Sequence, residues 1–289
     1  MNAHTIQNDA PQRPYLRVQP DTGWLALNLK EIWRFRDLLS TLATRDVKLR
    51  YRQTALGVIW VILQPLLGAG ILTFVFNTLL KAPTGGVPPF VFSFAGMLAF
   101  TLFSSILTKA STSLVQNAQM ISKVFFPRLI LPLSVTFSSF LDLAVGLVVM
   151  ALLLLFYGIM PGFGLLLLPL WMFFITLLAL GGGLFFGALM VSYRDVQYVV
   201  PVLMSLLTFA SPIAYSVSLV ISRLPMASRP FYFLFNPFAS LLEAFRWSII
   251  GRGDVQWGYV AFAALVSVAI FIVGALAFKS MEGKFADVI

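Results

Sequence analysis

The stretch from Arg45 to Leu67, RDVKLRYRQTALGVIWVILQPLL, places a cluster of basic residues directly before a long apolar segment. A helix needs about 20 apolar residues to cross the hydrocarbon core of a bilayer, and no charged residue occurs within residues 53–80. The stretch therefore predicts the inner end of a membrane span over residues 54–79. Gln64 and Pro65 lie inside this span, where a neighbouring helix or a water-filled path must satisfy the freed backbone groups.

Composition also indicates a membrane protein. Hydrophobic residues make up 59% of the 289 residues and charged residues only 11%, whereas about a quarter of a soluble domain is charged. The chain has no cysteine and a single histidine, His4, which excludes disulfides, thiolate nucleophiles and ordinary zinc sites. We interpret the net charge of +9 as topology information rather than as a sign of nucleic-acid binding. Residues 1–27 are polar, lack the apolar core of a signal peptide and predict a flexible cytoplasmic tail.

Charge-free apolar stretches predict the remaining membrane spans. With the first span they are expected over residues 54–79, 90–108, 130–157, 163–192, 196–221 and 258–278. The fifth contains Pro201 and Pro212, which should kink or unwind it. Residues 229–252 are apolar but are interrupted at Asn236-Pro237, so they predict a re-entrant outer hairpin rather than a seventh crossing. The expected fold is an all-α integral membrane protein, with residues 28–289 forming one transmembrane domain of six helices.

The distribution of basic residues supports six crossings with both termini in the cytoplasm. Only five of the 20 lysines and arginines then fall outside, namely Lys81, Arg223, Arg229, Arg246 and Arg252. This is the asymmetry that the positive-inside rule requires. The predicted location is the inner membrane of a bacterial cell.

Residues 28–44 predict an amphipathic helix at the membrane interface. Apolar residues recur at helical spacing at Ile32, Phe35, Leu39 and Leu42. The helix is either a simple membrane anchor or a docking platform for a cytoplasmic partner. Anionic lipid headgroups are expected to bind its basic residues and those that follow it, namely Arg34, Arg45, Lys48 and Arg52.

The start of the first span closely resembles that of ABC-2-type polysaccharide export permeases, the membrane subunits that export O-antigen, capsule and teichoic acid. The matching residues are Asp46, Arg50, Tyr51, Arg52, Leu56, Gly57, Trp60, Leu63, Gln64 and Pro65. The layout from about Lys30 onward is similar to such permeases. The resemblance implies a homodimeric half-transporter bound to a separate nucleotide-binding ATPase, which would carry ATP and Mg²⁺. This chain would carry no cofactor, because its glycine-rich GGGLFFG segment, Gly181–Gly187, lacks the lysine and hydroxyl of a phosphate-binding loop.

The resemblance also places a coupling helix in the loop between the second and third spans. That loop would insert into the ATPase, and it offers apolar anchors beside polar and basic residues. The candidate coupling residues are Gln116, Asn117, Met120, Lys123 and Phe125. The alternative is an ordinary cytoplasmic loop anchored by Lys123 and Arg128.

Several polar residues are predicted at membrane depth. Asp142 is expected to connect helices, although it can also pair with a base or bind a hydroxyl-rich substrate. Gly183 and Gly187 predict close helix packing. The candidate channel and gate residues are Gln64, Pro65, Phe231, Tyr232, Phe235, Glu243 and Arg246. Glu243 and Arg246 are three residues apart and are expected to pair on one helical face.

The leading interpretation is the permease subunit of an ATP-driven exporter of a lipid-linked, O-antigen-like polysaccharide. Its partners would be the ATPase, a second copy of the chain, the lipid-linked glycan and membrane lipids. Exporters of capsular polysaccharide, teichoic acid or a smaller lipid or drug are alternatives within the same family. A membrane-embedded transferase and a passive channel or scaffold are alternatives of other classes. The transferase interpretation is disfavoured because the acidic residues at depth are far apart in sequence.

Overall fold

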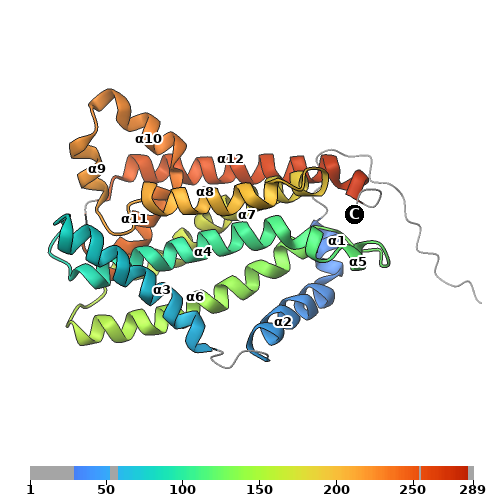
Figure 1. Ribbon diagram of the computed structural model, residues 1–289, viewed down its shortest axis with the longest axis horizontal. Helices are drawn as coiled ribbons and strands as arrows, with labels where there is room; N and C mark the ends of the chain where they lie inside the picture. The colour runs from blue at the N-terminus through green and yellow to red at the C-terminus, as the bar shows by residue number, and fades with distance from the viewer. Residues whose placement is uncertain (1–28, 53–57, 254, 286–289) are drawn as a thin grey trace, which may run out of the picture.

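The computed structural model describes residues 29–52, 58–253 and 255–285. Within these ranges every regular element is a helix and no strand occurs. The long helices run along one direction and form a bundle (Figure 1). This confirms the predicted all-helical class.

Five helical segments are long and apolar enough to cross a membrane by length and composition. They correspond to the predicted first, second, third, fourth and last spans. In chain order they are α3 (Val58–Leu72) with its π-helical continuation η1 (Thr73–Leu79), α4 (Pro89–Gln116), α6 (Ile130–Phe156), the 3₁₀ turn η2 (Phe163–Leu167) with α7 (Leu168–Ser192), and α12 (Trp257–Met281).

Helix α4 continues beyond its predicted end at residue 108. Its last turns are held by α7, because Gly183 and Gly187 allow the two backbones to approach closely. A Cβ atom on Gly183 would lie 2.6 Å from the Cβ of Ala110, and one on Gly187 would lie 3.2 Å from the Ala110 carbonyl oxygen. These glycines therefore pack helices within one copy of the chain, as small residues do in membrane bundles.

The predicted fifth span is broken into two helices. Helix α8 (Val196–Ala210) ends well before residue 221, and α9 (Val217–Arg223) follows after an irregular segment. Pro212 causes the break because proline disfavours a helical conformation at the residue before it. Ser211 accordingly has an extended backbone, with φ −92° and ψ 145°. At 15 residues, α8 is shorter than a full membrane crossing requires.

The predicted re-entrant region is also two helices. After a short 3₁₀ turn, η3 (Met226–Ser228), come α10 (Arg229–Phe235) and α11 (Pro237–Ile250). The amide oxygen of Asn236 accepts a hydrogen bond from the backbone N–H of Ala239 at 3.2 Å and caps α11. Helix α11 packs against α4, α7 and α12, so the second half of the hairpin belongs to the core.

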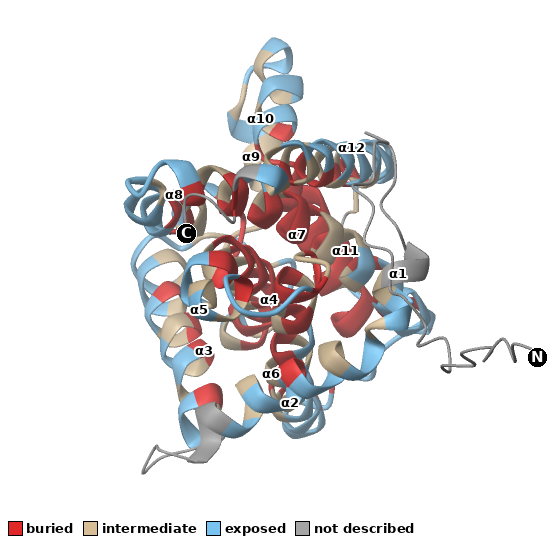
Figure 2. Ribbon diagram, turned by 90° about the vertical axis from the view of Figure 1, so that its right-hand side faces the viewer, coloured by how far each residue is buried: buried red, intermediate tan, exposed pale blue. Residues whose placement is uncertain are grey.

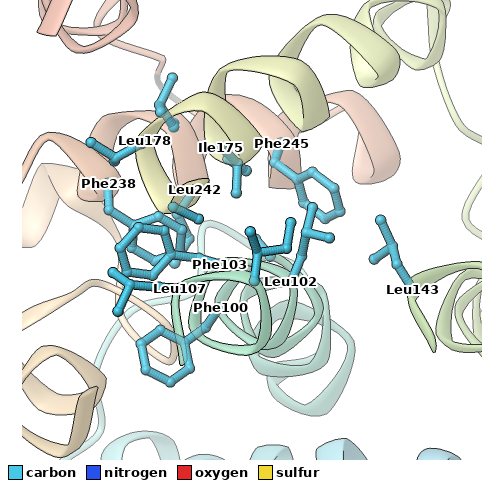
Figure 3. Packing of buried hydrophobic residues seen from close by; sticks show 14 of the residues in the cluster. Phe100, Leu102, Phe103, Leu107, Leu143, Ile175, Leu178, Phe238, Leu242 and Phe245 are labelled. Carbon is cyan, nitrogen blue, oxygen red and sulfur yellow. The ribbon is translucent and has the colours of Figure 1, made fainter. Parts of the chain in front are cut away.

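The centre of the bundle is formed by α4, α7 and α11. Figure 2 shows these helices as the most buried, with the exposed surface on the surrounding ones. Large side chains from the three helices interlock (Figure 3). The rings of Phe103 and Phe238, for example, stack with centroids 4.7 Å apart. Because lipid is as apolar as these side chains, it is their close van der Waals packing that stabilises the contact of the three helices.

The two ends of the bundle differ. One end carries α1 (Leu29–Arg34), α2 (Arg36–Arg52), the short α5 (Ala118–Ile121) and the end of α12, and the opposite end carries α9 and α10 (Figure 1). In the structure, the interface helix that was predicted over residues 28–44 consists of two helices, α1 and α2, and α2 continues to Arg52. Its apolar residues Ile32, Phe35, Leu39 and Leu42 pack against the bundle, with α2 lying on α6, rather than facing lipid.

We expect Gly274→Ala to destabilise the bundle, because α7 and α12 cross with their backbones almost in contact. A Cβ atom on Gly274 would lie 2.0 Å from the carbonyl oxygen of Gly181, and such overpacking costs about 1–3 kcal/mol or more. Thermal unfolding of the detergent-purified protein should shift to lower temperature. Gly258→Ala, on the same helix with no atom near the new Cβ, is the matched control. Equal melting temperatures for the two variants would contradict this packing.

Candidate functional site

A cavity of about 460 Å³ lies between α3, α4, α6 and α8. Among the described residues its wall combines eight apolar side chains with seven hydroxyl side chains, one amide, one lysine and one aspartate. The lining residues are Val61, Gln64, Pro65, Leu98, Phe100, Thr101, Leu102, Ser104, Ser105, Thr108, Lys109, Ser139, Asp142, Leu143, Pro201, Met204, Ser205 and Thr208. A polar cavity among apolar helices is a candidate binding site or conduit.

The hydroxyl groups of α4 gather on one side because their spacing follows the helical period. Ser104 and Ser105 follow Thr101 by three and four residues, and Thr108 follows them by four and three, so the four hydroxyls share a face. The Thr101 hydroxyl donates to the carbonyl oxygen of Met97 at 2.6 Å, a local bond that satisfies a hydroxyl inside an apolar helix. The result is a polar stripe along one face of α4.

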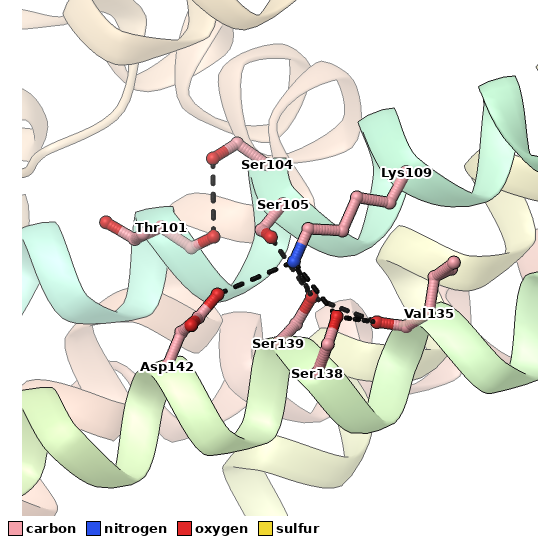
Figure 4. A network of polar contacts seen from close by, with 8 residues as sticks. All are labelled: Thr101, Ser104, Ser105, Lys109, Val135, Ser138, Ser139 and Asp142. Atoms are coloured by element: carbon pink, nitrogen blue, oxygen red, sulfur yellow. Dashed lines mark hydrogen bonds and ion pairs between the residues drawn. The ribbon is translucent and has the colours of Figure 1, made fainter. Parts of the chain in front are cut away.

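A charged network joins this stripe to α6 (Figure 4). The ammonium group of Lys109 donates to the Ser138 and Ser139 hydroxyls at 3.1 and 3.3 Å. Its Nζ lies 3.5 Å from Oδ2 of Asp142, and the Ser105 and Ser139 hydroxyls are 3.0 Å apart. Asp142 therefore connects two helices as predicted, and it does so through a basic partner.

We expect the cysteine pair Ser105→Cys/Ser139→Cys to form a disulfide between α4 and α6. The Oγ atoms of Ser105 and Ser139 are 3.0 Å apart, so the two sulfur atoms of the double variant are expected to meet and to join in a disulfide. The natural chain has no cysteine, so the two introduced cysteines are the only thiols that can react. After mild oxidation the double variant should no longer react with a maleimide polymer until it is reduced.

The control for this pair combines Ser105→Cys with Leu152→Cys. Leu152 lies several turns further along α6 and is exposed. Both cysteines of the control should stay reactive after oxidation. If the Ser105→Cys/Ser139→Cys protein also keeps two reactive thiols, α4 and α6 do not face each other as described.

A second polar constellation holds the broken segment between α8 and α9. The Arg246 guanidinium donates to the carbonyl oxygens of Pro212 and Ile213, both at 3.0 Å, and to the carboxylate of Glu243. Its central carbon lies 3.7 Å from the centroid of the Phe92 ring, a cation–π distance. Arg246 is 1% exposed and Glu243 4%. The predicted pairing of Glu243 with Arg246 is present. Arg246 binds the backbone of the segment between α8 and α9, and neither residue is among the described residues that line the cavity.

Side chains of the hairpin also donate hydrogen bonds to groups at the C-terminal end of α8. The Tyr232 hydroxyl donates to the carbonyl oxygen of Ala210 at 2.9 Å. The Asn236 amide donates to the same oxygen at 3.2 Å and to the Ser211 hydroxyl at 3.1 Å. Irregular backbone at membrane depth is tolerated where protein groups bind it in this way. Phe231 and Phe235, in contrast, lie on the exposed surface of α10.

At the opposite end, the interface helix contacts the predicted coupling loop. Arg45 donates to the Asn117 amide oxygen at 3.0 Å. Gln116 and Lys123 are exposed, Met120 is half-buried, and Phe125 is 67% exposed. Arg34 and Lys48 are exposed on the neighbouring helices, whereas the side chain of Arg52 lies outside the described residues.

The structure therefore separates the predicted channel residues into three groups. Gln64 and Pro65 line the cavity, Tyr232, Glu243 and Arg246 support the broken helix, and Phe231 and Phe235 face outward. Lys109 directly follows the predicted second span over residues 90–108, and its part in the cavity was not predicted. The available signal was the helical spacing of the α4 hydroxyls, which ends at this lysine.

These features define a multi-pass membrane protein with a partly polar cavity between α3, α4, α6 and α8. Residues 37–250 match the family described as ABC-2 type transporter. The chain belongs to this family, as the resemblance of the first span implied, and it has the architecture of an ABC-2 permease subunit.

Relatives over most of the chain include permeases of polysaccharide export. Two proteins from Klebsiella pneumoniae, each named O-antigen export system permease protein RfbA, are 26% identical over 261 residues, covering 88% of this chain and 95% of the relative. A protein of the same name from Myxococcus xanthus is 26% identical over 259 residues, covering 90% of this chain and 98% of the relative.

Proposed function

We propose that this chain is the permease subunit of an ATP-driven exporter that moves a lipid-linked, O-antigen-like polysaccharide from the cytoplasmic side across the inner membrane. The observation that carries the proposal is the cavity between α3, α4, α6 and α8, whose mixed wall includes seven hydroxyl side chains. A glycan presents hydroxyl groups along its whole length, and a membrane path for it must replace their hydrogen bonds to water. The names of the relatives support the same substrate class.

A second copy of the chain would complete the path. The cavity lies at the surface of one copy, since Gln64 and Ser205 line it and are exposed. Helices α3 and α8 flank it and carry exposed apolar residues, including Trp60, Leu67, Val202 and Leu206. We place the dimer contact along these two helices, which encloses the polar face and covers the apolar ones.

The energy would come from a separate ATPase at the end that carries α5. Phe125 and the adjacent Val124 are exposed apolar side chains next to Lys123, an apolar anchor with a charged rim of the kind that dominates protein interfaces. Arg45 ties this loop to α2. A movement of the loop driven by nucleotide binding would thereby be transmitted to α2. Helix α2 packs on α6, which borders the cavity. ATP and Mg²⁺ would bind to the partner, and this chain would perform no bond chemistry.

The proposed topology places this end of the bundle and both termini in the cytoplasm. Exposed Arg34, Arg45 and Lys48 lie here, where anionic headgroups of the inner leaflet would bind them. The exposed hairpin residues Phe231 and Phe235 would then lie at the outer face, beside the exit of the path.

Deleting the gene and complementing it in trans tests the proposal. We expect loss of the surface polysaccharide, with accumulation of the lipid-linked glycan inside the cell, and recovery of both on complementation. An exporter of a smaller lipid or drug would leave the surface glycan unchanged. A transferase would leave the cell without the completed lipid-linked glycan. Either result would contradict the proposed function.

A further inference from the structure

A second cavity, of about 340 Å³, lies at the end of the bundle that carries α9. Its described lining comes from η1 and the residues that follow it, from the C-terminal end of α8 and from α9. The first membrane segment ends at Leu79, and Lys81 follows almost directly. A long basic side chain at the end of a membrane helix reaches the level of the lipid headgroups. This cavity therefore lies at the membrane surface.

Two basic side chains from distant parts of the chain line this cavity. Lys81 follows η1 and Arg223 ends α9, and both side chains are exposed. Among the described residues, neither takes part in a hydrogen bond or an ion pair. A basic residue suits the C-terminal end of a helix, which accounts for Arg223 but not for a second cation at the same cavity. Two cations that both lack an acidic partner attract an anionic ligand.

The backbone holds Lys81 at this cavity in a strained conformation. Lys81 has a φ of 52°, and within the described ranges every other residue with a positive φ is a glycine. This left-handed conformation is unfavourable for a residue with a Cβ atom. It is fixed by Asn77, whose amide donates to the carbonyl oxygens of Ala82 and Ala214, both at 3.1 Å. Strained residues cluster where ligands bind, so the conformation supports a binding role for Lys81.

An apolar wall lies beside the two cations. The rings of Phe76 and Tyr215 both line the cavity, with centroids 5.4 Å apart. Leu80 and Phe209 line it too and are 66% and 63% exposed. Inorganic phosphate would use the cations alone, whereas a membrane lipid would use its anionic headgroup and its hydrocarbon chain. The combination of cations and apolar wall at the membrane surface therefore fits an anionic lipid.

We propose that Lys81 and Arg223 bind the phosphate of an anionic membrane lipid. Its hydrocarbon chain packs on Phe76, Leu80 and Phe209. Basic pockets between membrane helices bind anionic headgroups in this way. The bound lipid connects the end of the first span to α9, and through α9 to the hairpin helix α11, on which α9 packs. This inference goes beyond the proposed function, because it needs neither the glycan nor the ATPase.

Thiol protection tests the site. Leu219→Cys places a thiol in the cavity wall of a chain that has no natural cysteine. The full-length variant is purified in a neutral maltoside detergent and reacted with a small maleimide. We expect phosphatidylglycerol to slow the reaction severalfold. Diacylglycerol with the same acyl chains and inorganic phosphate, each at the same concentration, should not slow it.

Lys81→Gln and Arg223→Gln in this background should each raise the phosphatidylglycerol concentration for half-protection about fivefold, since a basic residue near anionic lipid contributes about 1 kcal/mol. Arg252→Gln, at an exposed position outside the described lining of this cavity, should leave that concentration unchanged. Ala227→Cys, exposed in η3 at the same end of the bundle, replaces Leu219→Cys as the control thiol. It should show no protection.

Half-protection that is unchanged in both charge variants, or equal protection by diacylglycerol, would overturn the site. Equal protection by inorganic phosphate would overturn its assignment to a lipid. A parallel titration with the strain's own lipid-linked glycan distinguishes the two sources of the headgroup, because the lower half-protection concentration identifies either a bilayer phospholipid or the lipid carrier of the glycan. The site and the proposed function fail separately. Gene deletion tests export in cells, whereas protection by phosphatidylglycerol is measured on the isolated chain.

Discussion

Replacing Arg246 by methionine is expected to prevent the chain from accumulating as a folded membrane protein. The substitution leaves the carboxylate of Glu243 buried without its partner, and removing one member of a buried pair costs about 3–5 kcal/mol. The carbonyl oxygens of Pro212 and Ile213 lose their donors as well, at about 1–3 kcal/mol each. These losses are comparable with the whole stability of a typical domain, about 5–15 kcal/mol.

The yield of monodisperse protein after membrane extraction measures this effect. Arg252→Met is the matched control, since Arg252 is exposed just beyond α11, and its yield should equal that of the wild type. The double variant Arg246→Met/Glu243→Leu should recover part of the yield, because it no longer buries an unpaired charge. An Arg246→Met protein that extracts and melts like the wild type would show that the broken helix is held by other groups.

The second large effect is expected from Phe125→Asp, which should abolish association with the ATPase. The Phe125 side chain is 67% exposed, so its replacement removes an apolar anchor from the surface without disturbing the core. Truncation of such an anchor typically costs 2 kcal/mol or more of binding free energy, about a thirtyfold loss of affinity. Co-purification of the ATPase with the tagged permease measures it, together with thermal unfolding of the permease alone.

Phe235→Asp is the matched control for this prediction. It is the same substitution at a phenylalanine that is 81% exposed, at the opposite end of the molecule (Figure 1). The ATPase should co-purify with Phe235→Asp as with the wild type. Equal ATPase recovery with both variants would mean that the loop after α5 is an ordinary loop, the alternative that the sequence left open.

The sequence predicted those parts of the fold that depend on local composition. Charge-free apolar stretches located the five long segments because the length of a membrane helix is set by the bilayer. Pro212 indicated a disturbance in the fifth predicted span, but not that the helix would end there. The end depends on Tyr232, Asn236 and Arg246, which are distant in sequence and supply the missing backbone partners.

The candidate site was predictable only in part. The Glu243–Arg246 pair follows from its spacing, whereas its contacts with Pro212 and Ile213 are tertiary. Lys109 directly follows the predicted span over residues 90–108, where a lysine normally marks the membrane surface. Side chains on a helix point back toward its N-terminus, and Figure 4 shows the Lys109 ammonium reaching back to the level of Ser105. This direction carries the charge into the cavity beside Asp142.

The most direct test of the central claim is transport in reconstituted vesicles that contain the lipid-linked glycan on the ATPase side. We predict ATP-dependent movement of the glycan to the other side only when the chain and its ATPase are reconstituted together. A catalytically inactive ATPase should give none. ATP-independent uphill transport by the chain alone, or no transport by the complete pair with ATP, would contradict the account.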